Sequence, residues 1–472
     1  MHLDRSRRRL VVAAASVVAA GCALKSPPTV SELQADALRN ASIPPAWRTP
    51  GGAAGTVADS WLATFGSPTL SALVTEALIY NADLRVASAR VEQAEAYLRV
   101  ANASLLPAIN LAGTWSGSAS GGGLNGIFLN ASLELDIWGR VRYGSVASGR
   151  QAESVLADYA YARQSLAAMI AKSWFLAIEA GLQREIALES LRASEALQKV
   201  SEDRFRIGNG NEQSVAVARS NVGAFRDSLR QIELSREQAL RALEMLLGRY
   251  PAAEIAVAAD LGAMPPPPPV GLPSELLERR PDVVAAERRV AAAFNRVGEA
   301  RAARLPRIGL TAGGSSVSSD VLVLKDRNNP AWGFGANLFA PLFDAGALKA
   351  QVEIRTAEQQ QAVAAYANAG LRAFNEVEGA LSAENALRDR GVILEATVRD
   401  NARALELSQI QFRVGSVDLQ AVEQRQISLY SARMTRLRVR SEQLAQRVNL
   451  HLALGGSFEV PAPPLAAASA AS

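Results

Sequence analysis

The sequence predicts a mainly helical protein that also contributes β strands to a membrane barrel. Three observations support this fold class. Good helix formers such as Ala, Leu, Arg, Gln and Glu dominate, while aromatic residues make up only 6% of the chain. A few short segments alternate apolar and polar residues, as strands do. The whole order of elements occurs twice, which indicates an internal duplication.

The first residues, "MHLDRSRRRLVVAAASVVAAGCALK", have the Arg-rich start and short apolar run of an export signal over 1–21. The ending "AAGC" resembles the lipobox of bacterial lipoproteins, although Ala19 replaces the usual Leu. That resemblance implies acylation of Cys22, with palmitate as the expected chain, and a lipidated N-terminal segment over 22–69. The alternative is a plain signal peptide with an incidental cysteine.

The two copies are marked by matched landmarks. Pro107 and Pro306 are 199 residues apart, and the glycines Gly208 and Gly415 are 207 apart. In each copy a helix, expected over 70–104 and 281–303, ends near a proline, the usual stop signal. The predicted divisions are a first repeat over 70–263 with a hairpin tip near 208, a Pro-rich linker over 264–273, a second repeat over 274–458 with a tip near 415, and a disordered tail over 459–472.

Four segments are expected to be strands of membrane length, at 107–119, 126–138, 307–318 and 331–342. Four strands cannot close a barrel, because about eight are the working minimum, so several chains must share one. In the second segment the apolar residues at alternate positions are expected to face lipid. The alternating polar residues are expected to face the barrel lumen: Asn130, Ser132, Glu134 and Asp136.

A soluble sheet with its polar side in water is the alternative interpretation of these strands. Three tryptophans, Trp115, Trp138 and Trp332, fit either aromatic girdles at the membrane surface or ordinary packing. No run of 18 apolar residues follows the signal, so any membrane span of the mature chain is expected to be β.

Two long helices are expected over 139–208 and 346–415. Each would extend about 100 Å at the α-helical rise of ~1.5 Å per residue. Each is followed by a glycine turn and a returning helix, which predicts two long hairpins. Their apolar positions recur at three- and four-residue spacing, so the hairpins need partner helices to cover them.

Enzyme chemistry is not expected. Once the signal is removed, His451 is the sole histidine and Cys22 the sole cysteine. Ser-His, Cys-His and His-rich metal arrangements are therefore unavailable, and no cofactor or metal is predicted. Signal removal also takes away four arginines and one aspartate, so the high pI does not indicate a nucleic-acid partner.

Several stretches carry a resemblance to a known family. They are "LPSELLERRPDVVAAERRVAAAFNRVGEARAARLPRIGLT" (Leu272–Thr311), the strand endings "ELDIWGRV" and "PLFDAGAL", and the tips "FRIGNGNE" and "FRVGSVDLQAVEQRQ". The sequence resembles the TolC-like outer membrane factors, specifically the NodT branch of lipoproteins that serve resistance-nodulation-division (RND) pumps. The resemblance covers the chain from Cys22 to Phe458.

The resemblance implies a homotrimer in the outer membrane lipid. Its 12-stranded barrel, four strands per chain, would stand on a periplasmic α-helical barrel girdled by an equatorial domain. It implies an efflux channel that passively conducts toxic compounds received from an inner membrane RND-type transporter and a periplasmic adaptor protein. The alternatives are an exit duct for type I protein secretion and a lipid-tethered structural coiled-coil protein.

The resemblance also implies sites near the two tips. The turns expected to dock the adaptor contain Arg206, Gly208 and Asn209 in the first copy and Arg413, Gly415 and Ser416 in the second. The periplasmic gate candidates are Asp418, Gln420, Glu423 and Arg425. A threefold ring of Asp418 or Glu423 would attract cations, with Arg413 and Arg425 available to pair with the acids. The alternatives are an ordinary glycine turn and an ordinary helix start capped by Asp418.

Overall fold

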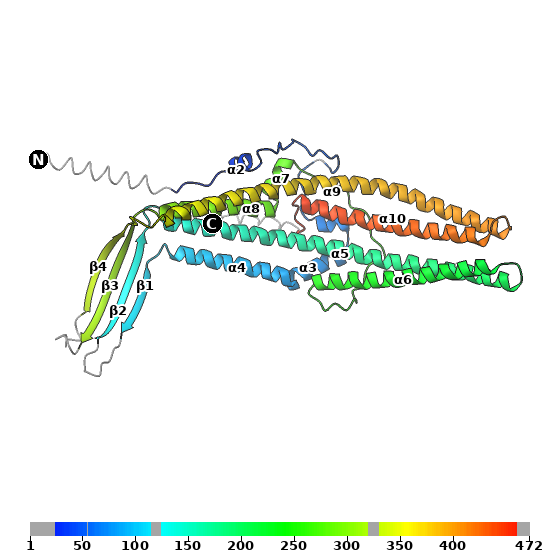
Figure 1. The fold of residues 1–472 in the computed structure, drawn as a ribbon, viewed down its shortest axis with the longest axis horizontal. Helices are drawn as coiled ribbons and strands as arrows, with labels where there is room; N and C mark the ends of the chain where they lie inside the picture. Colours follow the sequence, from blue (N-terminus) through cyan, green and yellow to red (C-terminus); the bar gives the residue numbers. More distant parts are fainter. Residues whose placement is uncertain (1–23, 54, 115–123, 320–329, 460–472) are drawn as a thin grey trace, which may run out of the picture. The chain divides into compact units, whose positions relative to one another are not determined.

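A computed structural model describes residues 24–53, 55–114, 124–319 and 330–459 (Figure 1). Within them the chain forms two compact units. The strand-bearing unit comprises the described residues of 1–42, 88–158 and 282–370. The hairpin-bearing unit comprises those of 43–87, 159–281 and 371–472. The two longest helices contribute residues to both units.

The elements follow the order seen in Figure 1. The first repeat contains α2 (Val30–Ala37), η1 (Trp61–Phe65), α3 (Pro68–Tyr80), α4 (Ala82–Ala103), β1 (Ala108–Thr114), β2 (Leu124–Leu135), α5 (Arg140–Arg206) and α6 (Glu212–Leu246). The second contains α7 (Pro273–Arg279), α8 (Pro281–Ala302), β3 (Arg307–Ser319), β4 (Pro330–Phe339), α9 (Ala347–Arg413) and α10 (Leu419–Ala453).

The two repeats match in helix length. Helices α5 and α9 both have 67 residues, α6 and α10 both have 35, and α4 and α8 both have 22. Each of the four hairpin helices begins and ends 207 positions from its counterpart. The prolines, 199 residues apart, follow the matched helices α4 and α8, whereas the tip glycines, 207 apart, follow α5 and α9. The two offsets therefore come from different elements of the same duplicated plan.

The single helix expected over 70–104 is wrong, because the chain breaks at Asn81. The Asn81 side chain donates Nδ2–H to the carbonyl of Leu246 (2.9 Å) and accepts from the backbone N–H of Leu84 (2.9 Å). Its extended backbone ends α3, and its side chain then caps α4. Asn is therefore a boundary residue here, even though the apolar periodicity continues across it.

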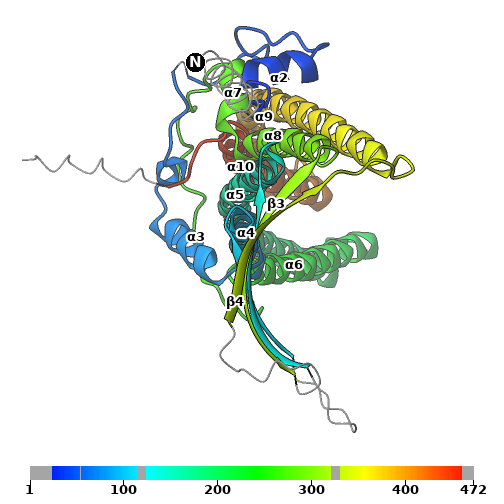
Figure 2. The same cartoon turned by 90° about the vertical axis from the view of Figure 1, so that its left-hand side faces the viewer.

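The strands form one antiparallel sheet in the order β1-β2-β3-β4. The four strands bend together, as Figure 2 shows. β1 pairs from Ala108↔Ser132 to Thr114↔Gly126, and β4 pairs with β3 from Arg307↔Phe339. In the described residues β1 and β4 each have a strand on one side only. The sheet is thus open at both edges within one chain.

The main hydrophobic core lies in the hairpin-bearing unit. Trp61, Trp174 and Leu240 are almost completely buried in it, together with residues of α3 and α10. One 18-residue window of α5 has enough mean hydropathy to cross a bilayer, but 61% of that window is buried inside the protein. This burial is typical of a core helix of a folded domain.

The Pro-rich linker lies against the N-terminal segment. The backbone N–H of Ala53 donates to the carbonyl of Pro268 (2.8 Å), and that of Val270 donates to the carbonyl of Ala53 (3.2 Å). Trp47 donates its indole N–H to the backbone carbonyl of Val270 (3.1 Å) and packs near Phe374 of α9. The linker is therefore held by backbone pairing, which its sequence does not reveal because most of its residues are prolines.

Candidate functional site

One face of the sheet is a continuous apolar surface. Directly paired residues of an antiparallel sheet point to the same face, so the register defines each row of side chains. One row runs Leu111, Leu129, Gly314, Trp332, and the neighbouring row runs Ile109, Ala131, Ala312, Phe334. The side chains of Leu111 and Trp332 are 72% and 76% exposed. An apolar face this exposed needs a partner other than water.

The opposite face is polar or small. The rows there include Asn110, Asn130 and Gly313, and next to them Ser132 and Thr311. Of the expected lumen residues Asn130, Ser132 and Glu134 lie on this face. Glu134 is held by a bidentate pair with Arg140 (2.7 and 2.9 Å). The alternation read from the sequence therefore extends across all four strands.

Asp136 lies outside the strand, because β2 ends at Leu135 rather than at 138. Its carboxylate accepts the backbone N–H groups of Val141 (3.0 Å) and Arg142 (2.9 Å) and also contacts the Arg142 side chain (3.1 Å). Asp136 thus caps the start of α5 instead of continuing the polar face of the strand.

The matching motif of the second repeat works in the same way. Strand β4 ends at Phe339, short of the expected 342, and Asp344 follows it. Asp344 accepts the backbone N–H groups of Gly346 (3.0 Å) and Leu348 (2.8 Å) at the start of α9. The motifs "ELDIWGRV" and "PLFDAGAL" therefore carry a strand-to-helix joint that positions each long helix.

The tryptophans differ in their surroundings. Trp332 is exposed on the apolar face and meets Phe334 edge-on with ring centroids 5.9 Å apart. Trp138 donates its indole N–H to the carbonyl of Pro306 (2.7 Å), which ties the end of β2 to the start of β3. Trp115 and the rest of the 107–119 segment beyond Thr114 lie outside the described residues, as does Cys22.

The two hairpin tips have the same geometry. Gly208 and Gly415 have φ angles of +78° and +80°, in the left-handed region that favours glycine. In the first tip the backbone N–H of Asn209 donates to the carbonyl of Arg204 (2.8 Å). In the second the backbone N–H of Ser416 donates to the carbonyl of Gln411 (2.9 Å). The turns are alike because the same backbone hydrogen bond forms at equivalent positions of the two repeats, although the residues there differ.

Both tips expose a large aliphatic side chain. Ile207 is 72% exposed and Val414 is 75% exposed, and they occupy equivalent positions directly before the tip glycines. Arg206 is also exposed and pairs with Asp203 (2.5 Å), while Arg413 is exposed at the second tip. The sequence analysis did not single out Ile207 and Val414. The sequence signal that could have identified them is an apolar residue directly before the turn glycine in both repeats.

The four gate candidates have different environments. Asp418 accepts the backbone N–H of Ala421 (2.9 Å) and so caps α10. Gln420 and Arg425 are exposed. Glu423 is only 6% exposed and accepts a hydrogen bond from Asn221 of α6 (3.0 Å). Within one chain, therefore, Gln420 and Arg425 are the candidates on the exposed side of α10, while Glu423 faces the neighbouring helix.

Burial raises the pKa of the Glu423 carboxyl, and the Asn221 hydrogen bond only partly offsets this. Neither Arg413 nor Arg425 forms an ion pair within the described part of the chain. The pairing expected between these arginines and the gate acids is thus absent from the described residues of a single chain. Asn221 is the partner that the sequence analysis missed, since it lies 202 positions away.

Comparison with known protein families shows which family the chain belongs to. It matches the outer membrane efflux protein family over residues 73–249 and 272–456, which cover most of both repeats and exclude most of the linker. The chain belongs to this family. The predicted resemblance to TolC-like outer membrane factors is therefore confirmed, and so is the predicted class of a mainly helical channel protein with membrane strands.

Curated relatives match this outer membrane efflux protein over most of their length. The cation efflux system protein CusC of Escherichia coli is 30% identical, and the match covers 84% of this chain and 88% of CusC. The pyoverdine export outer membrane protein OpmQ of Pseudomonas aeruginosa is 32% identical, with 84% and 87% covered.

Solved channels share the fold. The outer-membrane channel OprN is 28% identical with a TM-score of 0.79, and the match covers 88% of this chain and 99% of OprN. The open state of the Neisseria gonorrhoeae channel MtrE is 26% identical with a TM-score of 0.78, with 93% and 98% covered. The protein is thus an outer membrane channel by family and by fold.

Proposed function

We propose that three copies of this protein form the exit duct of a tripartite efflux system. The duct passively conducts small toxic compounds, which it receives from an inner membrane RND-type transporter and a periplasmic adaptor. One observation carries the proposal, namely a four-stranded sheet with a continuous apolar face and two open edges. Lipid cannot hydrogen-bond an open edge, so the edges must pair with those of other copies. Three copies supply twelve strands.

In this arrangement the apolar face meets lipid and the polar face lines the lumen. Asn130, Ser132 and Glu134 then face the permeating compounds. Their rows on β3 contain glycine and threonine rather than large side chains, which leaves room inside a barrel of this strand number. Asp136 is removed from the lumen set, because it caps α5.

The hairpin tips dock the adaptor. Support comes from their equal turn geometry and from the exposed Ile207 and Val414, which offer an apolar contact at each tip. The exposed guanidinium groups of Arg206, which pairs with Asp203, and of Arg413 lie beside these aliphatic side chains. The periplasmic closure lies just past the second tip, and Gln420 and Arg425 are its lumen candidates.

Acylation of Cys22 anchors each copy a second time. Acyl chains hold a segment at the membrane surface but do not span the bilayer, so in this proposal the barrel supplies the spanning attachment. The acyl chain contributes by keeping the N-terminal segment at the membrane surface. Cys22→Ala should therefore lower efflux without abolishing it.

The class of cargo follows from the relatives. CusC and OpmQ are named for the export of cations and of pyoverdine, which are far smaller than a folded or unfolded protein. This favours small-compound efflux over a type I protein secretion duct.

Deletion of the gene tests the function. We expect the deletion strain to become more susceptible to dyes, antibiotics or metal ions, and wild type to restore resistance on complementation. Electrophoresis of unheated outer membranes should show a compact trimer that heating dissociates. Unchanged susceptibility to all three compound classes contradicts efflux, while a monomer in unheated membranes contradicts the shared barrel.

A further inference from the structure

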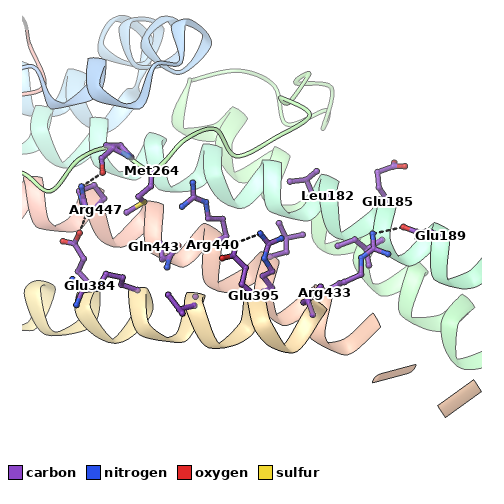
Figure 3. Close-up of a pocket in the computed structure, with 18 of the residues that line it drawn as sticks. Leu182, Glu185, Glu189, Met264, Glu384, Glu395, Arg433, Arg440, Gln443 and Arg447 are labelled. Carbon is purple, nitrogen blue, oxygen red and sulfur yellow. Dashed lines mark hydrogen bonds and ion pairs between the residues drawn. The ribbon is translucent and has the colours of Figure 1, made fainter. Parts of the chain in front are cut away.

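The hairpin-bearing unit contains a large cavity away from the tips and the strands. Its volume is about 1090 Å³, which is at the upper end of cavities that hold small organic ligands. Helices α5, α9 and α10 form its walls, and the linker residues Met264, Pro265 and Pro267 also line it; Figure 3 labels Met264.

The cavity combines apolar and charged walls. Its aliphatic surface comes from all three helices, mainly through Leu182, Ile186, Val392, Val398 and Leu437. Six arginines and four glutamates also line it, so arginine is in excess by two. Such a lining fits a ligand with an apolar body and negative charge.

Three of the arginines are already paired with the lining glutamates. Arg433 pairs with Glu189 (2.8 Å), Arg436 pairs with Glu395 (2.8 Å), and Arg447 pairs with Glu384. Arg447 also donates to the backbone carbonyl groups of the linker residues Pro265 and Pro266. These pairs neutralise their own charges and link neighbouring helices; Figure 3 marks such interactions with dashed lines.

Arg440 lacks such a partner. It lies one helical turn from Arg436 on α10 and is half-buried. Its only hydrogen bond among the described residues goes from Nη2 to the carbonyl of Gly262 (3.0 Å), and no carboxylate in the described part of the chain pairs with it. Burial and the neighbouring Arg436 charge lower the pKa of Arg440, and the charge of the Glu395 carboxylate, which pairs with Arg436, only partly offsets this. A bound anion would remove this electrostatic cost.

We propose that the cavity binds a small organic anion, with a carboxylate, sulfonate or phosphate group on Arg440 and an apolar body against Leu437 and Val392. A guanidinium presents several N–H groups in one plane, which suits bidentate contact with such an anion. Arg192 on α5 lines the same cavity and supplies further positive charge, while Arg388 on α9 also lines it but pairs with Asp389 (3.5 Å). The residues that line this site differ from those assigned to the barrel lumen, the tips and the gate, so the proposal does not depend on the proposed function.

Calorimetric titration of the purified trimer with benzene-1,3,5-tricarboxylate tests the site. This probe carries three carboxylates on an apolar ring, and neutral benzene-1,3,5-triol is the matched control ligand. We expect the tricarboxylate to bind with a Kd below about 1 mM. Arg440→Gln should weaken binding about tenfold or more, because it removes the charge-assisted hydrogen bonds.

Arg438→Gln is the matched control variant. Arg438 lies on the same helix, is exposed and does not line the cavity, so its loss changes the net charge equally. We expect it to bind as wild type does. If Arg440→Gln forms no trimer, Arg192→Gln replaces it and should weaken binding several-fold. No heat from the tricarboxylate with wild type, equal heat from the triol, or equal weakening by Arg438→Gln overturns the proposal. Efflux assays on the same variants keep this outcome separate from the channel function.

Discussion

The hydrogen bond between Asn221 and Glu423 gives a prediction about how tightly α10 is held to α6 near the tips. Asn221→Ala leaves a carboxylate that is only 6% exposed without its N–H donor. A hydrogen bond to a charged group contributes about 1.5–3 kcal/mol, and a buried group left unpaired costs a similar amount. Because ~1.4 kcal/mol is a factor of ten, local separation of the two helices should become roughly 10- to 100-fold more frequent.

Native-state hydrogen exchange measures this separation. We expect amides at the start of α10, over 419–430, to lose about 1.5–3 kcal/mol of protection in Asn221→Ala, while amides of the core around Leu240 keep theirs. Glu423→Gln and the double variant complete a mutant cycle, which isolates the coupling of the pair. Protection of 419–430 within about 0.5 kcal/mol of wild type in Asn221→Ala would refute the reasoning.

The same pair predicts a pH dependence. Burial raises the pKa of Glu423 above its unfolded value, so the folded chain binds more protons than the unfolded chain between the two values. The favourable contribution is therefore complete below the unfolded pKa and is lost as pH rises through the folded pKa. Glu423→Gln lacks this titration, so exchange in 419–430, corrected for intrinsic rates, should depend less on pH than in wild type.

Three further predictions concern other surfaces. Leu129→Arg places a charge on the apolar face and should cost about 2–4 kcal/mol per chain, abolishing the compact trimer in unheated membranes, whereas Asn130→Arg on the opposite face should keep it. Gly208→Ala should lower stability by about 1–2 kcal/mol through its positive φ alone, since the added Cβ meets no atom. Gly223→Ala, in a helix interior and equally open, should raise the melting temperature instead, so equal shifts in both would contradict the backbone argument. Burial lowers the pKa of His451 to about 4, so its contribution is present above pH 6.5 and lost as pH falls toward 4; thermal melts of His451→Phe should show a flatter profile across that window.

Much of the architecture is determined by local sequence patterns. Helix formers, glycine turns and the repeated landmarks specify two long hairpins, because these signals act within a few residues of each other. Alternation specifies the strands and their faces for a similar reason, since one residue of slip would invert every side chain. The kinship to outer membrane efflux proteins also follows from sequence, through the stretch Leu272–Thr311 and the tips.

The tertiary structure decided the features that depend on distant partners. Asp136 looks like one more polar strand residue, yet the start of α5 needs an acceptor for its free N–H groups, and that need ends the strand. Asn81 divides a helix because the carbonyl of Leu246 is within reach. Glu423 faces Asn221 because α6 and α10 pack together, and packing of α10 with its neighbours leaves Arg440 without an ion pair in the described part of the chain. Sequence alone thus determined most of the elements and the faces of the strands. Packing decided which polar groups hydrogen-bond within the chain and which remain free to bind other molecules.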